Sequence, residues 1–170
     1  LLFSHLRSKA PNAADVPTLP SVEIGEAQAQ AAQAAEAKAR DSELAATLFN
    51  TQWYLFRYPD IKEQSSALEH YLVYGWRAGR WPHPLFDPEY VLNQLPSEAR
   101  ASNPLLQYLQ PDLHLSPHPL FEETWYRNKY MSEADQAIKA LVHFSSHGAA
   151  KLDNPCSLFD SEWYAHQHPD

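Results

Sequence analysis

Large aromatic residues recur at a nearly fixed interval in this sequence, and this pattern constrains the fold more than any other feature. Phenylalanines that lie 37, 35 and 38 residues apart begin four segments: Phe49, Phe86, Phe121 and Phe159. Four residues after each of them comes a second large ring: Trp53, Tyr90, Trp125 and Trp163. Self-similarity with a period of about 20 to 50 residues is typical of repeat architectures. We therefore divide the chain into repeats of about 37 residues over 49–85, 86–120 and 121–158, with a partial fourth over 159–170.

Helix start and stop signals recur within these repeats and predict a helical hairpin. The residue after each phenylalanine is Asn50, Asp87, Glu122 or Asp160, and three of these four are good helix N-caps. Ten residues after the phenylalanine, three copies have a proline that would end the first helix: Pro59, Pro96 and Pro169. The residue that follows this position in each copy can cap a second helix: Asp60, Ser97, Ser132 and Asp170.

The second helix of each repeat is predicted to bury one face. In the first copy, Leu68, Tyr71 and Leu72 have the spacing of a buried helical face. Gly75 and Gly148 occupy equivalent positions near the end of this helix, where we expect left-handed C-caps. The aromatic residues that define the repeat are predicted to form its core, because large rings bury much apolar area. Since such units cannot bury their faces alone, neighbouring repeats are expected to stack into a short, elongated array.

The first 48 residues have a different composition from the repeats. Residues 1–21 are read as an N-terminal segment and a proline-rich linker. Residues 22–48 are rich in Ala, Gln and Glu and hold no proline, which predicts one long helix. A heptad seam along this helix is apolar at its ends and charged at Lys38 and Asp41. The helix is therefore either a homo-oligomer contact or a solvated spacer. The predicted fold class is all-α: a long Ala-rich helix followed by an array of helical hairpins.

Composition excludes several classes of function. The formal net charge is −8, from 13 Lys and Arg against 21 Asp and Glu, and no basic run is present to bind nucleic acid. A single cysteine, Cys156, excludes an internal disulfide and fits a reduced thiol in a cytoplasmic protein. Only four glycines occur, and they form no phosphate-binding motif, so no nucleotide cofactor is predicted. No apolar stretch reaches the length of about 18 residues that a membrane span needs.

Four residues of the first repeat form the candidate binding site: Trp76, Arg77, Arg80 and Trp81. The other copies have no aromatic residue at the two tryptophan positions, and exposed rings beside guanidinium groups suit sugar stacking or a protein contact. Local packing is the alternative interpretation. His83 and His118 lie in matching Pro-His-Pro segments one repeat apart, too far to share one metal ion, so no metal site is predicted. No residue is predicted to be catalytic.

The first repeat resembles a short repeat found beside bacterial glycosyltransferases, including rhamnan-synthesis-type proteins that assemble surface polysaccharide. Three stretches carry the resemblance: Trp53-Tyr54-Leu55-x-x-Tyr58-Pro59-Asp60-Ile61, Ala67-Leu68-x-His70-Tyr71-Leu72-x-x-Gly75-Trp76-Arg77-x-Gly79-Arg80-x-Pro82, and Leu85-Phe86-Asp87-x-x-Tyr90. The resemblance covers residues 49–170 and is closest in the first copy. The second copy has Asp112 to Ser116 in place of Gly-x-x-x-Gly-Arg, and the third has Gly148 to Leu152.

The resemblance implies a place in a glycan-building enzyme without placing the catalytic site in this chain, which has no Asp-x-Asp motif. We therefore expect a non-catalytic scaffold or interaction region of a larger bacterial glycosyltransferase, cytoplasmic or at the inner face of the membrane. Its expected partners are other domains of the same chain, a partner protein or a glycan. The alternatives are a free-standing protein-binding helical solenoid and a carbohydrate-binding module.

Overall fold

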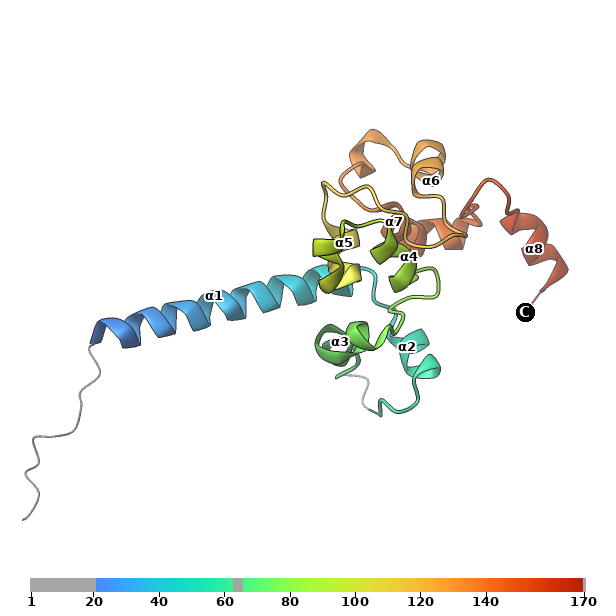
Figure 1. Cartoon of the computed structure of the whole chain (residues 1–170). Coiled ribbons are helices and arrows are strands. Elements are labelled where there is room, and N and C mark those ends of the chain that lie inside the picture. Colours follow the sequence, from blue (N-terminus) through green and yellow to red (C-terminus); the bar gives the residue numbers. More distant parts are fainter. Residues whose placement is uncertain (1–20, 63–65, 170) are drawn as a thin grey trace, which may run out of the picture. The chain divides into compact units, whose positions relative to one another are not determined.

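The computed structural model describes residues 21–62 and 66–169. Figure 1 shows that these residues form helices joined by turns and loops. The helices are α1 (Ser21–Ala46), α2 (Thr51–Arg57), α3 (Ala67–His70), α4 (Pro88–Asn93), α5 (Pro104–Leu109), α6 (Glu123–Tyr130), α7 (Ala140–His143) and α8 (Ser161–Gln167). Shorter π-helical and 3-10 turns are η2 (Tyr71–Gly75), η3 (Trp76–Ala78), η4 (Ser97–Ala101), η5 (Glu133–Asp135), η6 (Phe144–Gly148) and η7 (Ala149–Lys151). The all-α prediction is confirmed, because the described residues hold no strand.

The long helix predicted over residues 22–48 is present as α1, and the chain divides within it into two compact units, residues 1–37 and 38–170. In the first unit, every side chain of residues 28–37 is exposed. The two interpretations of this helix, spacer and oligomer contact, therefore both stay open. The predicted linker over residues 1–21 lies almost entirely outside the described residues, as does the predicted cap Asp170.

In the second unit, the first and third repeats share one local fold. Each has a first helix, α2 or α6, and a second helix that passes from an α-helical turn through a π-helical turn to a 3-10 turn. Each second helix ends at a left-handed residue, Gly79 with φ 66° or Leu152 with φ 59°. The second repeat differs, because the short helix α5 ends at Gln110 in an extended conformation. The absence of a glycine near this end of the second repeat fits that difference.

Among the described residues, the predicted caps of the second helices were wrong. These helices begin several residues later than predicted, at Ala67, Pro104 and Ala140. Ser132 and Asp135 form a reciprocal capping box, but it closes only the single 3-10 turn η5. Ser97 is the first residue of another 3-10 turn, η4, and its side chain caps no helix. Asp60 binds Arg80 instead of a helix terminus. A capping residue favours a turn, but it does not determine how far the helix continues.

Gly75 and Gly148 are not the predicted left-handed C-caps. Both have right-handed helical backbone angles, with φ of −61° at Gly75 and −67° at Gly148. A Cβ atom at Gly75 would collide with the hydroxyl oxygen of Tyr54, and one at Gly148 would collide with the hydroxyl oxygen of Tyr126. These glycines are therefore needed for close approach of a tyrosine to the helix rather than for backbone freedom.

The predicted core position was wrong by one residue along the first helix. Trp53, Tyr90 and Trp125 are only half-buried, and Trp163 is exposed. The fully buried side chains belong to the next residue: Tyr54, Val91 and Tyr126. One residue turns a helix by about 100°, which directs this side chain toward the second helix and leaves the tryptophan at the edge. Among the predicted phenylalanines, Phe86 and Phe121 are buried, Phe49 is half-buried and Phe159 is exposed.

A buried polar network connects the second repeat to the third. The hydroxyl of Tyr108 donates to Glu123 Oε2 at 2.6 Å, and the backbone N–H of Ala140 donates to Glu123 Oε1 at 2.9 Å. Arg127 donates to the same Oε1 at 3.1 Å and balances the buried charge. Burial and the neighbouring Glu123 carboxylate raise the pKa of Tyr108 well above its usual value, so its hydroxyl remains a donor. This network fixes α5 against α6 and the start of α7.

Tyr71 and Tyr108 occupy equivalent positions with different hydrogen bonding, which yields a first prediction. Among the described residues, the buried Tyr71 hydroxyl has no hydrogen-bond partner, because Pro88 stands where the third repeat has Glu123. Removing an unpaired buried hydroxyl relieves a desolvation cost, so Tyr71→Phe is expected to leave stability unchanged or to raise it. Tyr108→Phe is expected to lose about 1 to 2 kcal/mol. Urea unfolding of both variants tests this, and equal losses would contradict it.

Candidate binding site

The four residues of the predicted binding site lie in or just after the 3-10 turn η3, and each is engaged within the chain. The Trp76 indole N–H donates to the Leu72 carbonyl at 3.0 Å, and the Arg77 guanidinium lies over the Trp76 ring at 4.4 Å. The Trp81 ring packs edge-on against His118 with 5.6 Å between ring centroids. Both tryptophans are half-buried. The geometry therefore favours the local packing interpretation of these residues.

Arg80 is held by an ion pair rather than being free for a ligand. Its guanidinium donates to both carboxylate oxygens of Asp60, at 3.1 and 2.7 Å, and lies over the Tyr58 ring at 4.8 Å. The Arg80 hydrogen bond holds the pKa of the Asp60 carboxyl below its usual value. A bidentate pair of this kind fixes the segment after α2 to the end of the second helix. Arg80 therefore forms a contact within the first repeat.

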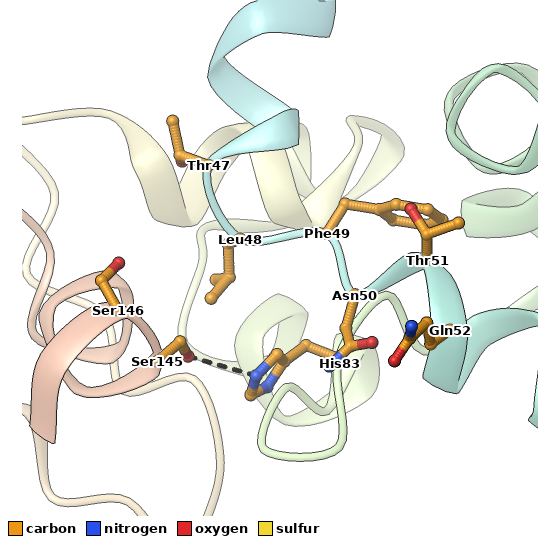
Figure 2. Close-up of a pocket in the computed structure, with 9 residues that line it drawn as sticks. All are labelled: Thr47, Leu48, Phe49, Asn50, Thr51, Gln52, His83, Ser145 and Ser146. Carbon is orange, nitrogen blue, oxygen red and sulfur yellow. Dashed lines mark hydrogen bonds between the residues drawn. The ribbon is translucent and has the colours of Figure 1, made fainter. Parts of the chain in front are cut away.

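A pocket of about 300 Å³ lies beside the junction of α1 and α2. Figure 2 shows that it is lined by residues of this junction, by His83 from the end of the first repeat, and by Ser145 and Ser146 from η6. The lining contributes hydroxyl groups and the amides of Asn50 and Gln52. Apart from His83, none of its side chains is ionisable. The pocket therefore suits a neutral, polar group better than a phosphate or a carboxylate.

The contact between His83 and Ser145 joins the first repeat to the third, across 62 residues of sequence. Stacked repeats make most of their contacts with their neighbours, so this contact is one that the predicted array does not anticipate. The Ser145 hydroxyl lies 3.2 Å from His83 Nε2. Sequence reasoning singled out His83 through its Pro-His-Pro segment but missed Ser145. Ser145 has no local pattern that could have revealed it.

The hydrogen bonds of His83 exclude a role as the general base for Ser145. The backbone N–H of Leu85 donates to His83 Nδ1 at 3.0 Å, so this nitrogen carries no proton. The neutral ring must then carry its proton on Nε2, which donates to the Ser145 hydroxyl oxygen. A base would need a free lone pair on Nε2 to accept the serine proton. The pair is consequently a structural hydrogen bond and not a nucleophile with its base.

Burial keeps His83 neutral, and this yields a pH prediction. Burial lowers the pKa of His83 from 6.5 to about 4, so the unfolded chain binds its proton more tightly than the folded chain. The contribution of neutral His83 to the free energy of unfolding should be fully present above pH 6.5 and should fall as the pH decreases toward 4. Between pH 7 and pH 5, His83 should account for a loss of about 2 kcal/mol.

His83→Asn supplies the test, because the asparagine side-chain oxygen retains the hydrogen bond from Leu85 without titrating. Urea unfolding of this variant should show a smaller loss of stability on acidification than the unchanged chain. His118→Asn is a matched control, since His118 Nδ1 also accepts a backbone N–H, that of Leu120, at 3.0 Å, but its ring is only half-buried. Equal acid sensitivity of the unchanged chain and of His83→Asn would contradict the prediction.

Other residue classes offer little further chemistry in the described part of the chain. No three His, Cys, Asp or Glu side chains lie close enough together there to hold a metal ion. Cys156 is a buried free thiol. Over residues 21–62 and 66–169, no helix combines the length and the apolar character needed to cross a bilayer.

Comparisons of this chain with models of known protein families, with curated proteins and with solved structures found no match. Function must therefore be inferred from the residues and their geometry.

Proposed function

We propose that this chain is a non-catalytic scaffold or interaction region of a larger bacterial glycosyltransferase that assembles polysaccharide. One observation carries the non-catalytic part of the proposal: the polar residues that recur in the repeats serve internal contacts. Tyr54 is hydrogen-bonded to His70 at 3.0 Å, and Tyr126 is hydrogen-bonded to His143 at 2.9 Å. The connection with glycosyltransferases rests on the resemblance of residues 49–170 to the repeats found beside such enzymes.

In this proposal the repeats bind other domains of the enzyme, a partner protein or the growing glycan, in the cytoplasm or at the inner face of the membrane. Helix α1 acts as a spacer or as an oligomer contact. Its exposed alanine-rich surface supports both roles, because small side chains allow close helix pairing and Ala-rich sequences also form stable solvated helices.

Three experiments test the proposed function. Titration calorimetry with nucleotide sugars should give no binding, and incubation with them should give neither hydrolysis nor transfer by this chain. Deleting residues 49–170 from the gene in its bacterial host should reduce surface polysaccharide, measured by sugar analysis of cell-surface extracts. Sugar transfer by the isolated chain would contradict the non-catalytic assignment. Unchanged polysaccharide after the deletion would contradict the role in glycan assembly.

Light scattering of the full chain at several concentrations distinguishes the two roles of α1. Ala31 and Ala34 lie on the predicted heptad seam. An oligomer that becomes a monomer in the Ala31→Glu, Ala34→Glu variant would identify this seam as an oligomer contact, because buried like charges prevent helix pairing. A monomer at all concentrations would identify α1 as a spacer.

The uncharged pocket favours carbohydrate binding as a second candidate function. Sugars are neutral and rich in hydroxyl groups, and amides and hydroxyls like those of Gln52 and Ser146 can bind them. Glycan-array binding that is lost in Gln52→Ala but retained in the Trp76→Ala, Trp81→Ala double variant would place the sugar in this pocket. Binding that is lost in the double tryptophan variant but retained in Gln52→Ala would assign the sugar site to Trp76 and Trp81. An array with no signal for the unchanged chain would exclude this candidate.

A further inference from the structure

The first helices of three repeats present the same ladder of three aromatic rings. The rungs are Phe49, Tyr54 and Tyr58 in the first repeat, Phe121, Tyr126 and Tyr130 in the third, and Phe159, Tyr164 and His168 in the fourth. Successive ring centroids are 5.0 and 4.9 Å apart in the first repeat and 5.3 and 5.0 Å apart in the third. In the fourth repeat they are 5.5 and 4.6 Å apart. The ladder of the fourth repeat is therefore already formed.

In the first repeat, the second helix covers this ladder through three features. His70 Nδ1 is hydrogen-bonded to the Tyr54 hydroxyl, and the Tyr71 ring packs on Phe49 and Tyr54 with centroid distances of 5.7 and 6.0 Å. Gly75, five residues after the histidine, leaves room for the same hydroxyl. Tyr54 is 0% exposed as a result.

The third repeat reproduces this cover with its own residues. His143 is hydrogen-bonded to the Tyr126 hydroxyl, and the Phe144 ring packs on Phe121 and Tyr126 with centroid distances of 5.6 and 5.7 Å. Gly148 leaves room for the hydroxyl, and Tyr126 is also 0% exposed. The cover is thus a helix with the pattern His-aromatic-x-x-x-Gly, and a π-helical turn extends from the aromatic residue to the glycine.

The second repeat shows what determines this pattern. Its first helix has Val91 in place of the tyrosine, so no hydroxyl needs a partner or space. Its second helix has Gln107 where the others have histidine and Asp112 where they have glycine. Histidine and glycine therefore occur together with the tyrosine hydroxyl and are both missing without it. The fourth repeat has Tyr164 at the position of Tyr54 and Tyr126. We therefore expect its ladder to be covered by a helix with the pattern His-aromatic-x-x-x-Gly.

Within residues 66–169, no second helix covers the ladder of α8. Tyr164 is 49% exposed and Phe159 is 40% exposed, whereas Tyr54, Val91 and Tyr126 are 0% exposed. The helix itself is well anchored at its start. Asp160 accepts the N–H of Trp163 at 2.9 Å, and the N–H of Ser161 donates to Asn154 Oδ1 at 2.8 Å. The exposed face is consequently a formed surface on a fixed helix.

We propose that the α8 face, defined by Phe159, Tyr164 and His168, is a docking site for a partner helix with the pattern His-aromatic-x-x-x-Gly. The histidine of the partner is hydrogen-bonded to the Tyr164 hydroxyl, and its next ring packs on Phe159 and Tyr164. Its glycine admits the hydroxyl, as Gly75 and Gly148 do in the covered repeats. This inference rests on the geometry of the repeats and is independent of the proposed function.

The test extends the full chain in register with its own cover helix. Ser132 and Asp170 both lie eleven residues after their phenylalanine, so a second copy of residues 133–155 is appended after Asp170. Hydrogen exchange of the backbone amides of residues 162–167 is then compared with that in the unextended chain. Docking should slow this exchange about tenfold or more, because amides of a covered helix exchange only when the cover opens.

Two matched variants show whether the cover binds as proposed. In the extended chain, changing only the appended copy of Gly148 to alanine should abolish the slower exchange, because the new methyl group meets the Tyr164 hydroxyl. Adding Tyr164→Phe, which removes this hydroxyl, should restore the slower exchange. Unchanged exchange on extension, or a glycine-to-alanine change without effect, would overturn the proposal. Self-association of the unextended chain by light scattering, lost in Tyr164→Arg, would assign the face to a second copy instead and would also overturn it.

Discussion

Gly75→Ala should destabilise the chain by about 3 kcal/mol, because the new methyl group overlaps the Tyr54 hydroxyl oxygen in a close-packed core. The Tyr71 ring and His70 also lie within 4 Å of the added atom, so the hydroxyl has little room to move aside. Urea unfolding followed by tryptophan fluorescence measures the loss.

A second substitution provides the control for this effect. Tyr54→Phe removes the colliding oxygen, so the double variant Gly75→Ala, Tyr54→Phe should be more stable than Gly75→Ala alone, as a double-mutant cycle would show. Gly25→Ala is the matched change at an open site, where a methyl group meets no atom within 4 Å. It should gain up to about 1 kcal/mol of helix stability. A double variant no more stable than Gly75→Ala would contradict the assigned collision.

Glu123→Ala should lose about 3 to 4 kcal/mol, since it removes the shared acceptor of Tyr108, Arg127 and the Ala140 N–H. The Arg127 charge would then lack its carboxylate in a largely buried position. The free energy of unfolding in urea tests this prediction.

The neighbouring residue Glu122 is the matched control for Glu123. Its carboxylate accepts a hydrogen bond from the exposed Ser157 hydroxyl at 3.0 Å and does not cap α6 with its side chain. Glu122→Ala should therefore cost less than about 1 kcal/mol. Similar losses for the two glutamates would show that the Tyr108 network contributes little to stability.

The starts of the first helices could be predicted because capping is a local interaction. Asn50, Asp87 and Asp160 each accept a backbone N–H within their own helix. Their signal lies within four residues of sequence, where it is unaffected by the rest of the fold. The N-terminal helix was equally accessible, because residues 22–46 favour a helix at nearly every position.

Features that depend on two distant elements could not be predicted in this way. Gly75 has the sequence context of a helix C-cap, and only the position of Tyr54, 21 residues earlier, gives it another role. The contact of His83 with Ser145 is set by packing across two repeats, which local patterns do not encode. The choice between Trp53 and Tyr54 as the buried ring likewise depends on where the second helix lies.

The close approach of tyrosine, histidine and glycine also restricts the order in which a repeat can change over generations. A repeat with the buried tyrosine, such as the first or the third, cannot exchange its glycine for a larger residue while the tyrosine keeps its hydroxyl. The intermediate form would be unstable, because the larger side chain would collide with the hydroxyl. Loss of the hydroxyl must come first, and the glycine and the histidine are then free to vary. The second repeat, with Val91, Gln107 and Asp112, has the composition that such a path would leave.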